Sequence, residues 1–96
     1  MKIRKVKHKG LRRFMEANDP AGLPAQNLER IRNMVSFLQE ISEADEARSI
    51  PSWRTHQLTG DRKGSWSLSV NRNWRITYRV DEEEGEILDL DYEDYH

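Results

Sequence analysis

The sequence predicts a single α+β domain over residues 1–96, in which two N-terminal helices pack on a mainly antiparallel sheet of four to five strands. Three observations predict this fold. Apolar residues recur at helical spacing through 28–41, apolar and polar residues alternate through 65–70 and 74–80, and turn-forming residues separate the alternating segments. Helices repeat about every 3.6 residues and half-buried strands about every two, so the two patterns can be told apart.

The N-terminal part of the chain predicts one strand and two helices. Residues 1–7 are expected to form a short strand, with lysines that protect a sheet edge. Helical spacing begins at Lys9 and stops at the run 18–20, because proline cannot continue a helix. A second helix is expected from near Pro24 to Ser42. Its apolar stripe consists of Leu28, Ile31, Met34, Val35, Leu38 and Ile41.

The rest of the chain predicts a meander of strands. Residues 43–50 are expected to add a loose helical turn that Pro51 ends, and the first strand of the meander is expected to begin near Trp53. Glycine, asparagine and aspartate favour tight turns, so the intervening polar runs read as hairpin connections. The later strands are expected at 65–70, 74–80 and 87–92, with turns at 60–64, 71–73 and 81–86.

Alternation gives the predicted sheet one apolar and one polar face. The polar face is expected to carry Arg75, Thr77 and Arg79. On the final strand, the sequence predicts that Leu88 shares the apolar face with Leu90 and Tyr92. The other residues expected on the apolar face are Trp66, Leu68, Val70, Trp74, Ile76, Tyr78 and Val80.

Charge is segregated along the chain although the net charge is only −1. Residues 1–13 carry seven lysines and arginines and no acid, residues 48–79 carry seven more against Asp61 alone, and residues 81–96 carry nine acids and no lysine or arginine. Cations gathered in this way attract a polyanion. Alternatively, the basic strands pair with the acidic C-terminal strand. The two interpretations are compatible.

Several classes of protein are excluded by composition. The chain has no cysteine, which excludes a disulfide framework and thiolate metal sites and fits a reducing compartment. No apolar run approaches the length of a membrane span, and the basic start is not followed by the apolar segment of a signal peptide. We therefore expect a cytoplasmic protein without a membrane partner.

Four features together carry a resemblance to a known family. They are Lys7-His8-Lys9-Gly10-Leu11, the central His56 followed by Leu58, Gly60-Asp61 and Gly64, the segments Trp66-Ser67 and Asn73-Trp74-Arg75-Ile76-Thr77, and the terminal Asp91-Tyr92-Glu93-Asp94-Tyr95-His96. The chain resembles, along nearly its whole length, the RelE superfamily of bacterial type II toxins, and most closely its HigB branch.

The resemblance implies an activity and partners. Proteins of that family are ribosome-dependent endoribonucleases that cut messenger RNA in the decoding site, and each is neutralised by an antitoxin. The implied partners are a helix-turn-helix antitoxin of the HigA type and the 70S ribosome with its message. Contact with operator DNA would be indirect, through the antitoxin complex. No cofactor and no metal are implied.

The implied chemistry is general acid–base catalysis. RNA supplies its own nucleophile, the 2′-hydroxyl, so cleavage needs a base, an acid and positive charge on the phosphate. Histidine suits both proton roles because its ordinary pKa is about 6.5. By resemblance, His56 and His96 are the acid–base candidates, Arg75 stabilises the phosphate, and Asp94 and Tyr95 complete the cluster. The expected RNA-binding residues are Asn73, Arg54, Arg62, Lys63 and Arg72.

The chain departs from the family pattern at one point. Members often carry Pro-Leu-Lys after the central histidine, whereas this chain has Gln57-Leu58-Thr59, so a lysine that would contact phosphate is missing. Arg54, Arg62 or Lys63 are candidates to replace it.

Other interpretations stay open at the level of sequence. His56 could be an ordinary surface residue, Arg75 could pair with Asp89 or Asp91 across the sheet, and Tyr95 could cap the core. Two other functions are compatible with the same fold. One is a non-enzymatic growth inhibitor, like the ParE gyrase poisons of the superfamily, and the other is a catalytically weak module that binds RNA or the antitoxin.

Overall fold

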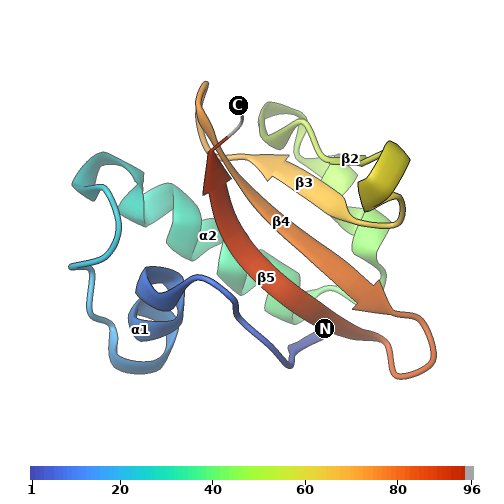
Figure 1. Cartoon of the computed structure of the whole chain (residues 1–96), viewed down its shortest axis with the longest axis horizontal. Helices are drawn as coiled ribbons and strands as arrows, with labels where there is room; N and C mark the ends of the chain where they lie inside the picture. Colours follow the sequence, from blue (N-terminus) through green and yellow to red (C-terminus); the bar gives the residue numbers. More distant parts are fainter. Residues whose placement is uncertain (95–96) are drawn as a thin grey trace.

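The computed structural model describes residues 1–94 of the chain. Strands, α-helices and short 3₁₀ turns, the last labelled η, follow one another along the sequence (Figure 1). Their order is β1 (Lys2–Ile3), α1 (Lys9–Ala17), η1 (Ala25–Asn27), α2 (Leu28–Glu40), η2 (Ala44–Ser49), η3 (Pro51–Trp53), β2 (His56–Gln57), η4 (Gly60–Arg62), β3 (Trp66–Ser69), β4 (Trp74–Asp81) and β5 (Glu86–Asp94).

The strands form one five-stranded sheet with the order β1-β5-β4-β3-β2. β1 runs parallel to β5, and every other neighbouring pair is antiparallel. The long β4 and β5 cross the middle of the sheet, and β5 lies between β4 and the N-terminal segment (Figure 1). The predicted α+β fold with a mainly antiparallel sheet is therefore confirmed.

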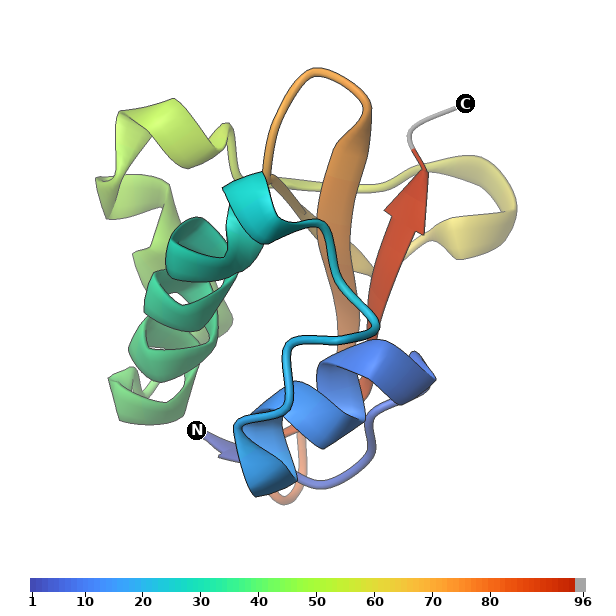
Figure 2. The same ribbon diagram turned by 90° about the vertical axis from the view of Figure 1, so that its left-hand side faces the viewer.

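The sheet separates two layers. Figure 2 shows α2 on one side of the strands and the segment around η4, coloured yellow, on the other. Among the described residues, no helix is both long and apolar enough to cross a membrane. The core lies between the helices and the sheet and is built from Leu11, Phe14, Leu23, Ile31, Met34, Val35, Leu38, Ile41, Ala47, Trp53, Trp66, Leu68, Val70, Ile76, Tyr78, Ile87, Leu90 and Tyr92.

The two predicted helices are present, with local reasons for their ends. α1 begins where Nδ1 of His8 accepts a hydrogen bond from the Leu11 amide, 3.0 Å away. It ends at Asn18, which adopts the left-handed conformation that favours asparagine and glycine. The second helix starts later than predicted, because Pro24 is followed by the 3₁₀ turn η1 before α2 begins at Leu28.

Two strands are shorter than the sequence predicted. Residues 1–7 were expected to form one strand, but β1 covers only Lys2–Ile3, and Val6 makes a separate bridge to Leu90. The first strand of the meander covers only His56–Gln57 rather than starting near Trp53. The reason is that Pro51 begins the turn η3, and Arg54 after it has a positive φ of 48°, which breaks the extended conformation.

A bulge in β5 corrects the predicted faces. Asp89 has φ of 53°, and the pairing with β4 shifts between Thr77 and Arg79. An extra residue in one strand reverses which side chains face the core on either side of it. Ile87 is therefore fully buried, whereas Leu88 lies opposite Arg79 on the polar face. The prediction that Leu88 shares the apolar face with Leu90 was wrong.

Candidate active site

A groove of about 620 Å³ opens where α2, the segment before β2 and the β3–β4 turn meet. Among the described residues that line it, three are arginines, one is a histidine and none is acidic. A concave surface lined by positive charges concentrates the electrostatic potential and attracts anions. The lining residues are Arg30, Ser52, Arg54, His56, Ser69, Asn71 and Arg72.

His56 is exposed on the edge strand β2, and a backbone contact orients its ring. Its Nδ1 lies 2.8 Å from the carbonyl oxygen of Arg54. A carbonyl oxygen can only accept a hydrogen bond, so this contact requires the proton on Nδ1. The neutral ring then has its lone pair on Nε2. The left-handed conformation of Arg54 thus presents an imidazole that can take up a proton at Nε2.

The β3–β4 turn is built around the side chain of Asn71. Its Oδ1 accepts hydrogen bonds from the amides of Asn73 and Trp74, each 2.9 Å long. Its Nδ2 donates to Oδ1 of Asn27 at 3.1 Å. This arrangement leaves Arg72 and Asn73 exposed on a turn whose backbone is fixed.

Arg30 of α2 joins the two segments that form the groove. Its Nη2 donates to the carbonyl oxygens of Ser52, at 2.9 Å, and Ser69, at 3.2 Å. The sequence reasoning missed this residue. The available signal was an arginine on the polar face of the second helix, which does not by itself reveal that it reaches two distant carbonyl groups.

The polar face of the sheet continues from the groove toward β5. His56 lies opposite Ser67, and Ser67 lies opposite Thr77. In the next row, Arg75 of β4 lies opposite Glu93 of β5. Residues directly opposite each other in an antiparallel pair point to the same face. His56, Arg75 and Glu93 therefore share the polar face.

The Glu93 carboxylate accepts hydrogen bonds from Arg62 and Thr77. Nη1 and Nη2 of Arg62 donate to its two carboxylate oxygens, at 2.8 and 2.6 Å, and the buried Thr77 hydroxyl donates to it as well. The hydrogen bonds from Arg62, followed by that from Thr77, hold the pKa of Glu93 below its ordinary value against the opposing effect of burial. The same ion pair raises the pKa of Arg62.

The structure brings some of the predicted site residues together. His56, Arg54 and Arg72 line one groove, and Asn73 follows Arg72 in the turn. Asp94 is paired with Trp74, so it lies at the same end of the sheet as this turn. The described residues lining the groove do not include Arg62 or Lys63, which belong to η4 and its C-terminal end. Tyr95 and His96 lie outside the described residues.

Cross-strand charge pairs are present, as the second interpretation of the charge pattern predicts. Arg79 donates to Asp89 at 3.2 Å, and Arg4 binds Asp81 and Glu86 at 3.2 and 3.0 Å. Arg4, just after β1, and Arg79 of β4 thus neutralise part of the acidic C-terminal segment. Within residues 1–94, no group of three histidine, aspartate or glutamate side chains comes close enough to hold a metal ion.

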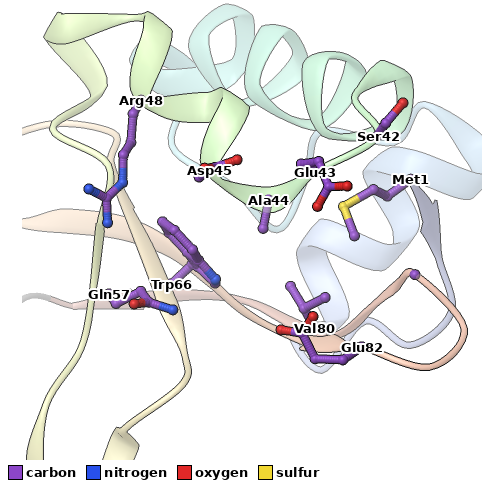
Figure 3. A pocket seen from close by; sticks show the side chains of 11 residues that line it. Met1, Ser42, Glu43, Ala44, Asp45, Arg48, Gln57, Trp66, Val80 and Glu82 are labelled. Atoms are coloured by element: carbon purple, nitrogen blue, oxygen red, sulfur yellow. The ribbon is translucent and has the colours of Figure 1, made fainter.

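A second cavity, of about 470 Å³, differs in character (Figure 3). Glu43, Asp45 and Glu82 contribute acidic groups to its wall, and the Arg48 guanidinium lies 5.1 Å from the ring of Trp66. Figure 3 shows these side chains between the η2 segment and the strands. Its acidic wall repels phosphate, so the cationic groove is the better candidate for an RNA site.

Comparison with known proteins agrees with this fold. The family model described as the RelE-like toxin of the type II toxin-antitoxin system HigB matches residues 4–96. A protein from Proteus vulgaris named Endoribonuclease HigB is 40% identical over 95 residues, which cover 98% of this chain and 99% of that protein.

Solved structures with lower sequence identity share the fold. The YoeB/ParE toxin from Agrobacterium tumefaciens superposes with a TM-score of 0.54 at 19% identity, covering 97% of this chain and 99% of that one. YafQ from E. coli strain BL21(DE3) has a TM-score of 0.57 at 10% identity, covering 99% and 94%. With the family match over nearly the whole chain, these comparisons show that the protein belongs to the HigB-like family of RelE-like toxins of type II toxin-antitoxin systems.

Proposed function

We propose that this toxin is an endoribonuclease that cleaves messenger RNA in the decoding site of the ribosome and thereby inhibits translation. The observation that carries the proposal is the cationic groove that contains His56. Its support is the 40% identity, over nearly the full length, to a protein named as an endoribonuclease.

His56 serves as the general base. It takes the proton of the 2′-hydroxyl at Nε2, since Nδ1 is hydrogen bonded to the Arg54 carbonyl. The 2′-oxygen then forms a bond to phosphorus while the bond from phosphorus to the 5′-oxygen breaks. The products are a 2′,3′-cyclic phosphate and a 5′-hydroxyl. This route requires no metal ion.

The remaining roles follow from the resemblance and from position. His96 protonates the 5′-oxygen that leaves, with Asp94 and Tyr95 completing the terminal cluster. Arg75, which shares the polar face with His56, stabilises the negative charge that develops on the phosphoryl oxygens. Each proton-transfer group in such a reaction typically contributes on the order of 10²- to 10⁴-fold.

The arginines of the groove bind the RNA backbone. Arg54 and Arg72 are exposed in the groove beside His56, and Asn73 offers an amide that orients the RNA. Lys63 is exposed beyond the groove and is a candidate contact with ribosomal RNA. Arginine suits phosphate because its planar guanidinium makes paired hydrogen bonds.

A type II toxin is paired with an antitoxin, and we propose one with a helix-turn-helix fold for this protein. Operator DNA would then be contacted through that antitoxin. A target on the 70S ribosome implies action in the cytoplasm.

Primer extension on a defined message tests the proposal, with programmed 70S ribosomes present or absent. The native protein is expected to cut only when ribosomes are present, and His56→Ala and His96→Ala are each expected to abolish the cut. His8→Asn is the matched control, because it removes the third histidine but keeps a side chain able to cap α1.

Two outcomes would contradict the proposal. Equal cleavage by His56→Ala and the native protein would remove His56 from the reaction. No cleavage by the native protein, while its expression still arrests growth, would instead favour a non-enzymatic inhibitor on this fold.

A further inference from the structure

The contact between Arg62 and Glu93 is a bidentate ion pair on the polar face of the sheet. It uses two parallel hydrogen bonds, of 2.8 and 2.6 Å, in the geometry that gives guanidinium–carboxylate pairs their strength. In this pair and the neighbouring pair of Arg79 with Asp89, the two acids are similarly exposed, at 23% for Glu93 and 27% for Asp89, but Arg62 is 42% exposed whereas Arg79 is 63% exposed. Solvent therefore screens the Arg62–Glu93 pair less.

This pair connects two parts of the molecule that are 31 residues apart in the sequence. Arg62 lies in η4, within the segment 58–65 that crosses the polar face, and Glu93 lies near the end of β5 (Figure 2). A hydrogen bond of 2.8 Å from the Leu58 amide to the Ser65 carbonyl oxygen joins the two ends of the segment. Residues 59–64 are exposed, so burial contributes little to fixing them.

Glu93 also faces the proposed phosphate-binding arginine. Arg75 lies directly opposite it in the pairing of β4 with β5, and the positive charge of Arg75 helps to lower the pKa of Glu93. Thr77 donates to the same carboxylate. With Arg62 and Thr77 holding its oxygens, the carboxylate is a fixed negative charge beside Arg75.

We propose that Glu93 is a positioning residue for RNA cleavage, which with Arg62 clamps the 58–65 segment over the sheet and sets the position of Arg75. The inference rests on the proposed function, since Arg75 acts only if the phosphate is bound on this face. It also changes the expected role of Arg62 from an RNA-binding residue to the partner of Glu93. Glu93 itself touches no reacting atom.

The two roles of Arg62 predict opposite kinetics. If Arg62 bound RNA, Arg62→Ala would raise KM and make KM less dependent on salt concentration. Glu93→Ala would release Arg62 for RNA binding and so lower KM. If the pair is a clamp, both substitutions lower kcat and leave KM and its salt dependence unchanged. Loss of positioning of this kind is expected to cost on the order of 10-fold in kcat.

A double-mutant cycle makes the test sharper. The variant with both Arg62→Ala and Glu93→Ala should cleave no more slowly than either single variant, because the two substitutions remove one interaction. Arg79→Ala is the matched control: it removes an exposed ion pair from the same face and should leave kcat unchanged. Thermal unfolding of every variant verifies that the fold is intact.

Hydrogen exchange of the isolated protein measures the clamp without any cleavage. The amides of 58–65 should exchange faster in both single variants than in the native protein, while the amides of β4 stay protected. Unchanged exchange in Glu93→Ala, or a rise in KM alone in Arg62→Ala, would overturn the inference. Absence of cleavage by the native protein would contradict the proposed function, whereas the exchange result would still decide whether the clamp exists.

Discussion

Asn27 and Asn71 are joined by a hydrogen bond of 3.1 Å that ties the start of the helical layer to the β3–β4 turn. Asn27 is 5% exposed, and its Nδ2 donates to the Tyr92 hydroxyl at 2.8 Å. The Tyr92 ring in turn stacks on Trp74, with centroids 4.7 Å apart and planes at 8°. The turn that presents Arg72 and Asn73 is thus held by contacts of Asn71 and Trp74 with the buried side chains of Asn27 and Tyr92.

Asn27→Leu should destabilise the fold and loosen this turn. The substitution leaves the buried hydroxyl of Tyr92 without its hydrogen-bond partner, which typically costs about 1–3 kcal/mol, and it also removes the bond to the exposed Asn71. Urea unfolding measures the loss, and RNA binding should weaken with it. Gln26→Ala, at the exposed neighbouring position, is the control and should change stability by less than about 0.5 kcal/mol.

Arg54→Gln and Arg72→Gln should weaken binding to single-stranded RNA and make it less sensitive to salt. Each arginine that contacts a phosphate contributes a slope of about −0.7 to the dependence of log affinity on log salt concentration. Titrations of a short RNA at several salt concentrations give this slope. Arg13→Gln, an exposed arginine of α1, should leave the slope unchanged, and an equal effect there would indicate unspecific attraction.

Gly10→Ala should destabilise the protein although alanine favours helices. A Cβ at position 10 would lie 2.5 Å from the carbonyl oxygen of Gly22, where backbone meets backbone. Overpacking of this kind costs about 1–3 kcal/mol. Thermal unfolding tests the expectation, with Glu16→Ala on the exposed part of α1 as control. A more stable Gly10→Ala variant would show that the two segments can move apart.

Glu93→Gln should reduce the acid sensitivity of stability. The pKa of Glu93 is lowered from 4.5 in the folded protein, chiefly by Arg62, so the unfolded chain takes up the proton first as pH falls. The contribution of this group is complete above about pH 4.5 and is lost as pH falls through the lowered pKa. The groups around its carboxylate are Arg62, Arg75, Thr77 and Asp91.

Urea unfolding of both proteins between neutral pH and pH 3 measures the difference, which should shrink as the solution becomes acidic. A constant difference across that range would mean that the charge of Glu93 contributes nothing to the pair.

Local patterns were sufficient for most of the elements. The stripe of Ile31, Met34, Val35 and Leu38 predicted α2, and the alternation around Leu68 and Ile76 predicted β3 and β4. These patterns depend on side chains a few residues apart, so the sequence contains them directly. For the candidate site, the resemblance predicts a role for His56, and the sequence offers Arg54 and Arg72 as RNA-binding candidates; the structure places all three in one groove, and their roles stay predictions.

Other features depend on residues far apart in the chain. Arg30 reaches carbonyl groups 22 and 39 residues away, and Arg62 pairs with Glu93 across 31 residues. A charge pattern shows that such partners are available but does not select among them, since several acids compete for each arginine. The sequence therefore predicts Arg62 as a candidate RNA-binding residue but does not reveal its ion pair with Glu93.

The sequence by itself determined the fold class, the main helices and strands, and the family, because period, turn residues and motifs are local properties of the chain. Only the tertiary structure decided that the bulge at Asp89 places Ile87 in the core, that Arg30 joins the two walls of the groove, and that Glu93 holds Arg62. These outcomes are set by the register of β4 against β5 and by the packing of α2 on the sheet. Both are fixed by the balance of contacts over the whole domain.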